Sequence, residues 1–359
     1  MFRNPMKKIL FSATALVAVV SLVLAGCGDD NDSEGADSSD KPLIVVTTNI
    51  LGDVVTNMVG DSFDVETIMP PGSDPHDFQA SAQQVQMMMS ADLLIVNGAN
   101  FEEGMLDVIE NAESDGVMIF EATSVISQLE GSDDHSDHGG HDDHDDHEGH
   151  DDHDEEKDHD DHEGHGHDEE KDHDDHEGHD HGGIDPHFFT DPARMAIVAQ
   201  ELSEVLAANF PDADQGFVST ANDYVQQLQD LDSEVEETLS VISSDKRLLV
   251  TNHGVFAYFA DRYSFTILGE IIPSSSTLAS ASAQQLASLA EEIKESQVKA
   301  IFADASSSDA LAQTLSDEVN DVKVINLYTE SLGDPGSSGG SYIDMIRFNA
   351  EAIASALVE

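Results

Sequence analysis

Two spacings of apolar positions alternate along the first part of the chain. Short apolar runs, each suited to one buried strand, are separated by segments in which apolar residues recur every three or four positions. The runs are Leu43–Thr48, Leu93–Val96 and Val117–Phe120, and the expected helices are Ile50–Val59 and Ser81–Ala91. Buried strands that alternate with helices indicate a parallel sheet covered on both faces.

The last part of the chain repeats this order of strands and helices. Four further runs predict strands, at Leu248–Thr251, Phe265–Leu268, Ala300–Ala303 and Val322–Ile325. Helical spacing returns at Gln284–Ser296, Ala310–Val319 and Tyr342–Leu357. We therefore expect an α/β fold with two lobes, residues 41–212 and 244–359, each built on a mainly parallel sheet flanked by helices.

A long helix is predicted between the lobes, after a shorter helix at Asp191–Phe210. Apolar residues follow at steps of three, four or seven, which places them on one stripe: Phe217, Tyr224, Leu228, Leu231, Val235, Leu239 and Ile242. The helix would cover 213–243 and extend roughly 45 Å. We interpret it as a rigid strut that joins the lobes across one cleft and limits their closure.

The N-terminus has the features of an export signal. Basic residues precede the apolar run Ile9–Leu24, which ends in Leu-Ala-Gly-Cys27. This ending resembles a bacterial lipobox, in which residues 1–26 are removed and Cys27 is lipidated. The alternative is an uncleaved transmembrane anchor, for which the apolar run is near the short limit. Residues 27–40 are rich in Asp, Ser and Gly and predict a flexible tether.

Residues 132–183 consist almost entirely of Asp, Glu, His and Gly, so they cannot form a packed core. Asp154–His165 recurs as Asp168–His179 within this insertion in the first lobe. Paired imidazoles and carboxylates there would collect metal weakly and raise its concentration near the cleft; the alternative is a solvated acidic linker. The candidate auxiliary ligands are His135, His138, His141, His144, His147, His150, His153, His159, His162, His165, His167, His173, His176, His179 and His181.

The composition narrows the partners and the ligand types. Seventy-four acidic and 14 basic residues give a formal net charge of −60. Nucleic acids and anionic membrane surfaces are therefore poor partners. Because the chain has one cysteine, a lipidated Cys27 leaves neither a disulfide nor a thiolate ligand. Any metal site must be built from His, Asp and Glu.

Three histidines, His76, His187 and His253, lie in globular sequence, each on a loop that leads into an expected helix. A single histidine in such a place is more often structural, but three in similar settings favour a site. Ligands of open α/β sheets bind beyond the carboxyl ends of the strands. Imidazoles suit Zn²⁺, and a tetrahedral shell needs a fourth donor, a carboxylate or water. Asp304 and Glu330 both follow strands, so position does not choose between them, although Asp304 is the better candidate for a loop-stabilising carboxylate.

The chain resembles the cluster A-I substrate-binding lipoproteins of zinc and manganese ABC importers. Four motifs carry the resemblance: Gly-Ser-Asp-Pro-His76, Asp-Pro-His187, Thr-Asn-His253-Gly-Val-Phe-Ala-Tyr-Phe, and Thr-Glu330-Ser-Leu with the tail Gly-Ser-Tyr-Ile-Asp-Met-Ile-Arg-Phe-Asn. It implies two α/β lobes joined by a long rigid helix, with metal in the cleft. By motif, His76 and His187 would be ligands from the first lobe, and His253 and Glu330 from the second, with Glu330 preferred to Asp304.

The resemblance also implies a metal and a partner. Manganese members of the family typically carry Glu where this chain has His253, and three imidazoles with one carboxylate suit Zn²⁺ better than Mn²⁺. The order of affinities alone does not exclude Cu²⁺, Ni²⁺ or Fe²⁺. We expect a monomer, anchored through Cys27 to the outer face of the cell membrane (the periplasmic side if an outer membrane is present), that delivers Zn²⁺ to the permease of an ABC importer.

Three other functions are alternatives to zinc delivery. One is a manganese-binding or other divalent-metal protein of the same transporter class, and another is a surface adhesin or metal buffer. The third is a zinc hydrolase with water at an open position. The sequence has no His-Glu-x-x-His pair, and four protein ligands would close the shell, so we expect no enzyme activity.

Overall fold

The computed structural model describes residues 41–131, 183–320 and 322–358. The expected signal segment, the tether with Cys27 and the fifteen auxiliary histidines lie outside the described residues. None of the helices in the described ranges combines the length and the hydropathy that crossing a bilayer requires.

The first lobe is built on a four-stranded parallel sheet in the order β2-β1-β3-β4. Its strands are β1 (Leu43–Val46), β2 (Asp64–Thr67), β3 (Leu93–Val96) and β4 (Ile119–Glu121), and its helices are α1 (Asn49–Val59), α2 (Ala82–Met89) and α3 (Leu106–Ser114). Alternate residues of β1 enter different cores, because successive side chains of a strand point to opposite faces. Ile44 and Val46 pack in the cluster that contains α1, and Val45 packs with residues of α2 and α3.

The second lobe has a parallel sheet of the same design, in the order β6-β5-β7-β8. Its strands are β5 (Leu248–Thr251), β6 (Thr266–Glu270), β7 (Ala300–Asp304) and β8 (Lys323–Leu327). Its helices are α6 (Ala257–Tyr263), α7 (Ala283–Ser296), α8 (Ala310–Val319) and α9 (Tyr342–Val358). Ile301 and Ala303 pack toward α7 and α8, while Phe302 packs in the cluster that contains α6 and α9. The predicted α/β class with two lobes is therefore confirmed.

Helix starts follow local capping chemistry. Ser81 and Ser282 begin α2 and α7, and each forms a capping box with the glutamine three residues later. The side chain of Asp191 caps α4 (Pro192–Asn209), whose first position is the proline that suits it. Each cap satisfies backbone N–H groups that have no partner inside the helix.

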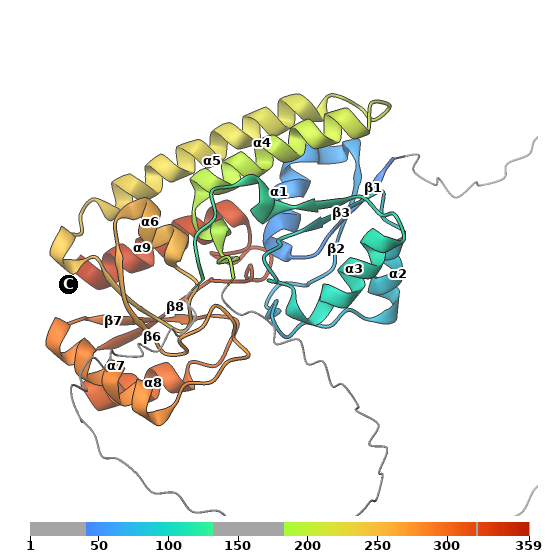
Figure 1. The fold of residues 1–359 in the computed structure, drawn as a ribbon. Coiled ribbons are helices and arrows are strands. Elements are labelled where there is room, and N and C mark those ends of the chain that lie inside the picture. Colours follow the sequence, from blue (N-terminus) through green and yellow to red (C-terminus); the bar gives the residue numbers. More distant parts are fainter. Residues whose placement is uncertain (1–40, 132–182, 321, 359) are drawn as a thin grey trace, which may run out of the picture. The chain divides into compact units, whose positions relative to one another are not determined.

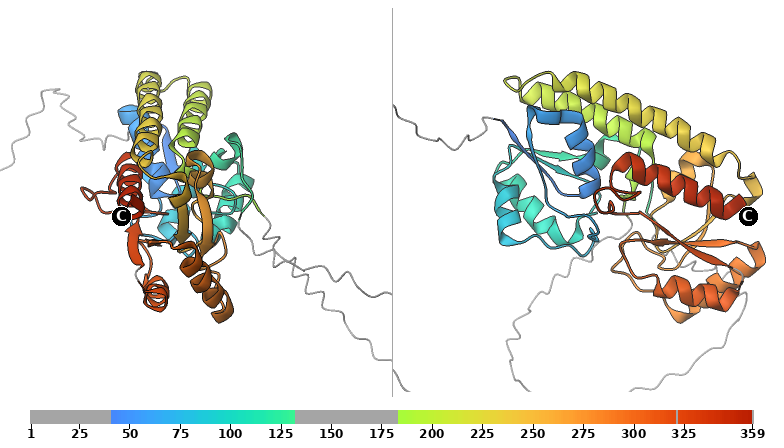
Figure 2. Two further views of the ribbon diagram at one scale, coloured as in Figure 1. Left: turned by 90° about the vertical axis from the view of Figure 1, so that its left-hand side faces the viewer. Right: turned by 180° about the vertical axis from the view of Figure 1, so that it is seen from behind.

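Two long helices, α4 and α5 (Phe217–Leu239), lie side by side across both lobes (Figures 1 and 2). Helix α5 packs against α1 of the first lobe and α9 of the second, and its buried face includes Leu228 and Val235. It has 23 residues, so its length is roughly 35 Å. The helix predicted over 213–243 is therefore shorter than expected, by four residues at each end. Ile242 continues the apolar spacing but is buried in a turn beyond the helix end.

Both sheets point the carboxyl ends of their strands toward the site described next. In each sheet the chain passes from the first strand to one neighbour and then to the opposite neighbour, which creates a topological switch point. His76 lies on the connection after β2, His253 follows β5, and Glu330 follows β8. His187 follows an antiparallel bridge between Glu130 and Ile184.

Candidate metal site

Two copies of the sequence Asp-Pro-His form the same local turn. The backbone N–H of His76 donates to Asp74 Oδ1 at 2.9 Å, and that of His187 donates to Asp185 Oδ1 at 2.8 Å. A short acidic side chain that accepts from the backbone two residues later forms such a turn, and proline between them restricts the chain. Each turn presents its imidazole at the end of a rigid loop.

The loop that carries Glu330 is held on both sides by asparagine side chains. Asn49, at the start of α1, donates to Ser331 Oγ at 2.8 Å and accepts from the backbone N–H of Leu332 at 2.8 Å. Asn349, on α9, accepts from the backbone N–H of Tyr328 at 3.0 Å. The position of the carboxylate thus depends on groups from both lobes.

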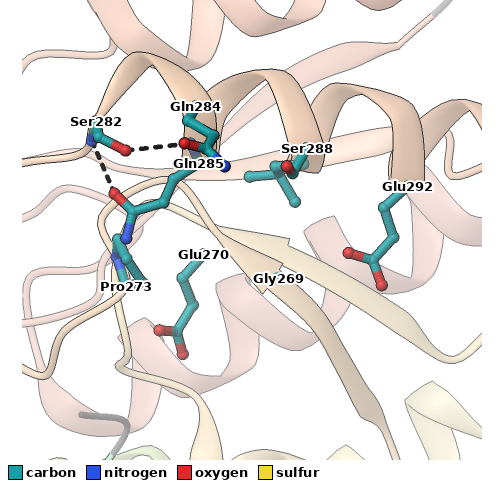
Figure 3. A pocket seen from close by; sticks show the side chains of 9 residues that line it. Gly269, Glu270, Pro273, Ser282, Gln284, Gln285, Ser288 and Glu292 are labelled. Atoms are coloured by element: carbon teal, nitrogen blue, oxygen red, sulfur yellow. Dashed lines mark hydrogen bonds between the residues drawn. The ribbon is translucent and has the colours of Figure 1, made fainter. Parts of the chain in front are cut away.

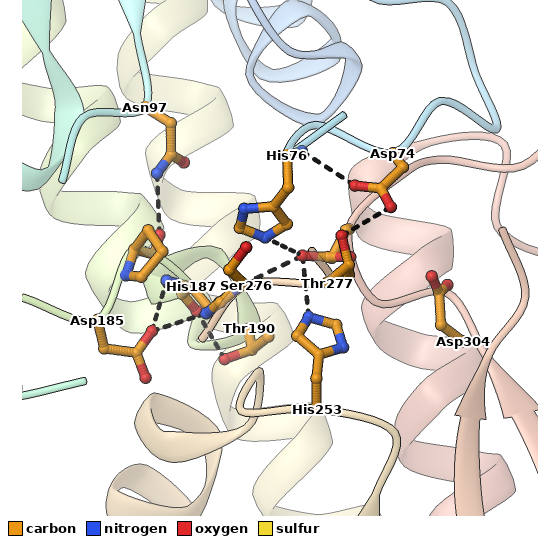
Figure 4. A network of polar contacts seen from close by, with 12 residues as sticks. Asp74, His76, Asn97, Asp185, His187, Thr190, His253, Ser276, Thr277 and Asp304 are labelled. Carbon is orange, nitrogen blue, oxygen red and sulfur yellow. Dashed lines mark hydrogen bonds and ion pairs between the residues drawn. The ribbon is translucent and has the colours of Figure 1, made fainter. Parts of the chain in front are cut away.

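Three imidazole rings converge on one carboxylate oxygen (Figure 4). The Nε2 atoms of His76, His187 and His253 lie 2.8, 3.2 and 3.0 Å from Glu330 Oε1. All four side chains are buried, and their candidate ligand atoms lie within 4.8 Å of one another. Ligand atoms of a tetrahedral zinc site are roughly 3.3 Å apart, given metal–ligand distances of about 2.0–2.1 Å. The spacing therefore suits a small divalent cation.

Outer carboxylates determine which nitrogen of two rings carries a proton. His76 Nδ1 lies 2.9 Å from Glu103 Oε1, and His187 Nδ1 lies 2.8 Å from Asp185 Oδ1. Because a carboxylate can only accept, both Nδ1 atoms donate. The neutral rings then direct the Nε2 lone pair inward, as metal-binding histidines do when a carboxylate holds the other nitrogen.

The charges of the site favour a bound cation or bound protons. Burial by itself lowers the pKa of His76, but Glu330 and Glu103 outweigh it and raise the pKa to about 10. The pKa of His187 is raised as well, because Asp185 and Glu330 outweigh its burial. Burial opposes the charge of Glu330, yet the surrounding histidines hold its pKa well below the usual range. Glu330 Oε2 is buried and has no hydrogen-bond partner among the described residues, which is unusual unless an ion or water occupies the site.

Asp304, the other candidate for the carboxylate, lies apart from the three imidazoles (Figure 4). Its Oδ1 accepts from the backbone N–H of Ser306 at 2.9 Å, and its Oδ2 accepts from the Ser306 hydroxyl at 2.6 Å. Burial and the neighbouring Glu330 raise the pKa of Asp304. Asp304 therefore stabilises its own loop, and the structure brings Glu330, not Asp304, to the histidines.

Sequence reasoning missed several residues that shape the site. The Asp-Pro-His motif contained a signal for Asp185, since the aspartate is part of the motif. Glu103 and Asn49 have no such signal, because they reach the site from loops and helix ends distant in sequence. Phe101 and Phe189, whose rings contact His187, had none either.

The described residues contain no second group of His, Cys, Asp and Glu that could hold a metal. A cavity of about 470 Å³ lies between β6 and α7 of the second lobe (Figure 3). Glu270 and Glu292 line it together with the side chains of Gln284 and Ser288. No histidine lines this cavity, so it differs chemically from the site around Glu330.

Known proteins that resemble this chain in sequence and in structure point to one family and one fold. The family described as zinc-uptake complex component A, periplasmic, matches residues 44–356. The manganese ABC transporter substrate-binding lipoprotein PsaA of Streptococcus anginosus is 26% identical over 360 residues, which cover 98% of this chain and 99% of that protein. The manganese-binding lipoprotein MntA of Halalkalibacterium halodurans is 24% identical over 352 residues, with coverages of 98% and 99%.

Solved structures show the same architecture. The periplasmic zinc binding protein TroA from Treponema pallidum matches with a TM-score of 0.69 at 25% identity, covering 88% of this chain and 99% of that chain. A Mn-bound periplasmic metal binding protein from candidatus Liberibacter asiaticus matches with a TM-score of 0.68 at 20% identity, covering 88% of this chain and 100% of that chain. The second likeness concerns the fold alone.

Proposed function

Because the chain belongs to the zinc-uptake complex component A family, we propose that it captures Zn²⁺ and delivers the ion to the permease of an ABC importer. At the level of its family, the chain is the extracytoplasmic, metal-binding component of an ABC transporter that works with a permease and an ATPase. It is a solute-binding protein and not an enzyme.

One observation supports the assignment of the metal. Three buried imidazole nitrogens lie within 3.2 Å of one carboxylate oxygen. A shell with three nitrogen donors and one carboxylate suits Zn²⁺, whereas Mn²⁺ prefers more oxygen donors and a larger coordination number. We therefore propose His76, His187, His253 and Glu330 as the ligands of Zn²⁺.

Manganese is the second candidate, and the names of the relatives favour it. PsaA of Streptococcus anginosus and MntA of Halalkalibacterium halodurans are both named for manganese. The two candidates differ in what His253 does. If the chain selects zinc, the third imidazole is the group that distinguishes it from manganese carriers with Glu at this position.

The test uses the mature protein without residues 132–182, compared with His253→Ala and His253→Glu. The ends of this segment are adjacent, since Gly131 N donates to Gly183 O at 2.9 Å, so a short glycine link can replace it. We expect one tightly held Zn²⁺ per chain, measured by elemental analysis and competition calorimetry. His253→Ala should lose it, and His253→Glu should shift preference toward Mn²⁺. A wild-type protein that holds Mn²⁺ more tightly than Zn²⁺ would refute the zinc assignment.

The auxiliary parts of the proposal concern residues outside the described ranges. We propose that the His-rich segment between His135 and His181 collects metal with lower affinity and that Cys27 carries a lipid anchor. The relatives named as lipoproteins support the anchor. Calorimetry of the intact mature chain should show several weaker sites beside the tight one, and mass spectrometry of Cys27→Ser should show loss of acylation. Equal numbers of sites with and without residues 132–182 would exclude the collecting role.

A further inference from the structure

Phe101 touches two of the proposed ligands at once. Its ring centroid lies 5.1 Å from that of His76 at an interplanar angle of 80°, and 5.4 Å from that of His187 at 89°. The two imidazole centroids lie 5.9 Å apart, so the three rings form a nearly equilateral triangle. Phe101 is 1% exposed. Neither imidazole can move toward the phenyl ring without displacing it.

A second aromatic ring confines His187 from another side. The Phe189 centroid lies 5.9 Å from His187 at 77° and 5.4 Å from Phe101. Edge-to-face contacts of this kind have a preferred orientation and resist rotation of either ring. The position of His187 is therefore fixed by the contact of its Nδ1 with Asp185, and the orientation of its ring by the two phenyl rings.

The backbone before Phe101 adopts a conformation that needs external support. Residues 98–100 all have positive φ, at 87°, 51° and 60°, although Ala99 and Asn100 carry side chains. Such residues persist only where the surroundings hold them. Glu102 accepts from the backbone N–H of Asn97 at 2.7 Å, and Glu121 accepts from that of Ala99 at 3.3 Å. These bonds fix the loop, and with it the phenyl ring.

We propose that Phe101 is a positioning residue that fixes the spacing of His76 and His187 and so strengthens selection of Zn²⁺ against Mn²⁺. The inference rests on the zinc function proposed above. A compact tetrahedral shell fits imidazoles held at one spacing, whereas Mn²⁺ needs room for further oxygen ligands. That expansion would require the two rings to shift or rotate, and the phenyl ring opposes rotation and any shift toward itself. If Phe101 merely filled the core, its replacement would weaken the binding of every metal equally.

The experiment measures Zn²⁺ and Mn²⁺ affinity of the full mature chain, with chelator-buffered metal at concentrations that leave weaker sites empty. Phe101→Leu removes the ring, and Phe101→Met keeps most of the volume with a flexible chain, should the first variant not fold. Phe63→Leu is the control, because Phe63 is also buried and makes two edge-to-face contacts, with Phe210 and Phe217. Substoichiometric Co²⁺ reports coordination, since tetrahedral Co²⁺ absorbs visible light far more strongly than six-coordinate Co²⁺.

We expect the ratio of the Mn²⁺ to the Zn²⁺ dissociation constant to fall about tenfold in both Phe101 variants, the lower end of typical effects of groups around metal ligands. The Co²⁺ absorption should weaken, while Phe63→Leu keeps the wild-type ratio and spectrum. An unchanged ratio, or equal weakening for both metals, in a folded Phe101 variant would overturn the inference. The wild-type ratio tests the zinc function separately, because that ratio does not involve the substitution.

Discussion

Glu330 is the residue on which the chemistry of the site converges. One of its oxygens faces three imidazole nitrogens, and the residue is 2% exposed. A buried carboxylate without a compensating charge is strongly unfavourable. Without metal, protons on His76 and His187 supply the compensation, in agreement with their raised pKa values. Metal and protons therefore compete for the same nitrogens.

The competition predicts that pH affects the stability of the metal-free protein and of the zinc-loaded protein differently. The folded pKa of His76 is about 10, against about 6.5 when unfolded. Its contribution to stability is complete below about pH 6.5 and is lost as pH rises through about 10. We expect the free energy of unfolding of the metal-free protein to fall between pH 7 and 10, measured by urea denaturation with a chelator. The zinc-loaded protein should lack this decrease, and a metal-free profile that rises with pH would contradict the assignment.

Asp185 provides a second prediction at the level of one side chain. Asp185→Asn keeps an oxygen that can accept from the backbone of His187 but removes the charge beside Nδ1. Zinc affinity should fall roughly 10-fold to 100-fold, as is typical when a carboxylate behind a metal-binding histidine is changed. Competition with a chromophoric chelator measures the change. Glu234→Gln, which removes an exposed pair with Arg347, is the control and should have no effect.

At this scale the sequence predicted the histidines but not their surroundings. His76, His187 and His253 could be found because three sparse histidines share one kind of position. Glu330 and Asp304 could not be separated by position, because Asp304 ends β7, Glu330 follows β8, and the two strands are neighbours in one sheet. Hydrogen bonds to Ser306 distinguish Asp304 in the structure, and a pattern of residue types does not contain them.

At the scale of elements, the start of α1 fixes a loop of the other lobe. Asn49 bonds to Ser331 and Leu332 across 282 and 283 positions of sequence. The Ser331 hydroxyl also accepts from Gly72 N on the loop that leads to His76, at 2.8 Å. One helix terminus therefore ties together the loops that carry His76 and Glu330.

Asn49→Ala should loosen this connection. We expect zinc to bind about tenfold more weakly and the free energy of unfolding to fall by roughly 1–3 kcal/mol, since the backbone N–H of Leu332 loses its acceptor and the Ser331 hydroxyl loses one of its two donors. Calorimetry and urea denaturation measure the two effects. Asn57→Ala, on the exposed side of the same helix, should leave affinity unchanged. Equal affinities for wild type and Asn49→Ala would show that the loop holds its position without the asparagine.

Elements with a strong apolar stripe were predicted well, and the others were not. The strand Leu93–Val96 and the helix Ala310–Val319 have the predicted bounds. Helix α3 buries only Ala112 and was not predicted. A helix was expected after His253 but without bounds, because the seven residues of α6 are too few to show a helical period. The end of α5 was predicted too far along the chain for a different reason: Ile242 is buried like the apolar residues of the helix, although the helix ends at Leu239.

At the scale of the whole described unit, one apolar core passes beneath α5 from lobe to lobe. The cluster includes Ile44 of the first sheet, Leu228 of α5 and Leu249 of the second sheet. Polar contacts add to it, including Thr277 Oγ1 to Asp74 Oδ2 at 2.8 Å. A continuous core opposes the bending that hinged closure requires.

Metal binding should therefore change the dimensions of the protein little. We expect the radius of gyration of the protein lacking residues 132–182 to be the same with and without Zn²⁺, within the error of small-angle X-ray scattering. Local ordering should instead appear as slower amide exchange near His187 and Glu330. A marked compaction on addition of Zn²⁺ would show that the lobes rotate despite the shared core.

The bridge between Glu130 and Ile184 has a consequence for how this protein can evolve. Because Gly131 N bonds to Gly183 O, the fold fixes where the intervening segment leaves and returns, but not how many residues it contains. The composition of this segment predicts flexibility, and doubling the length of a flexible loop costs only about 0.6 kcal/mol. Duplication of a unit such as Asp154–His165 therefore adds imidazoles at almost no cost to folding. We therefore expect related proteins to differ in the number of such repeats.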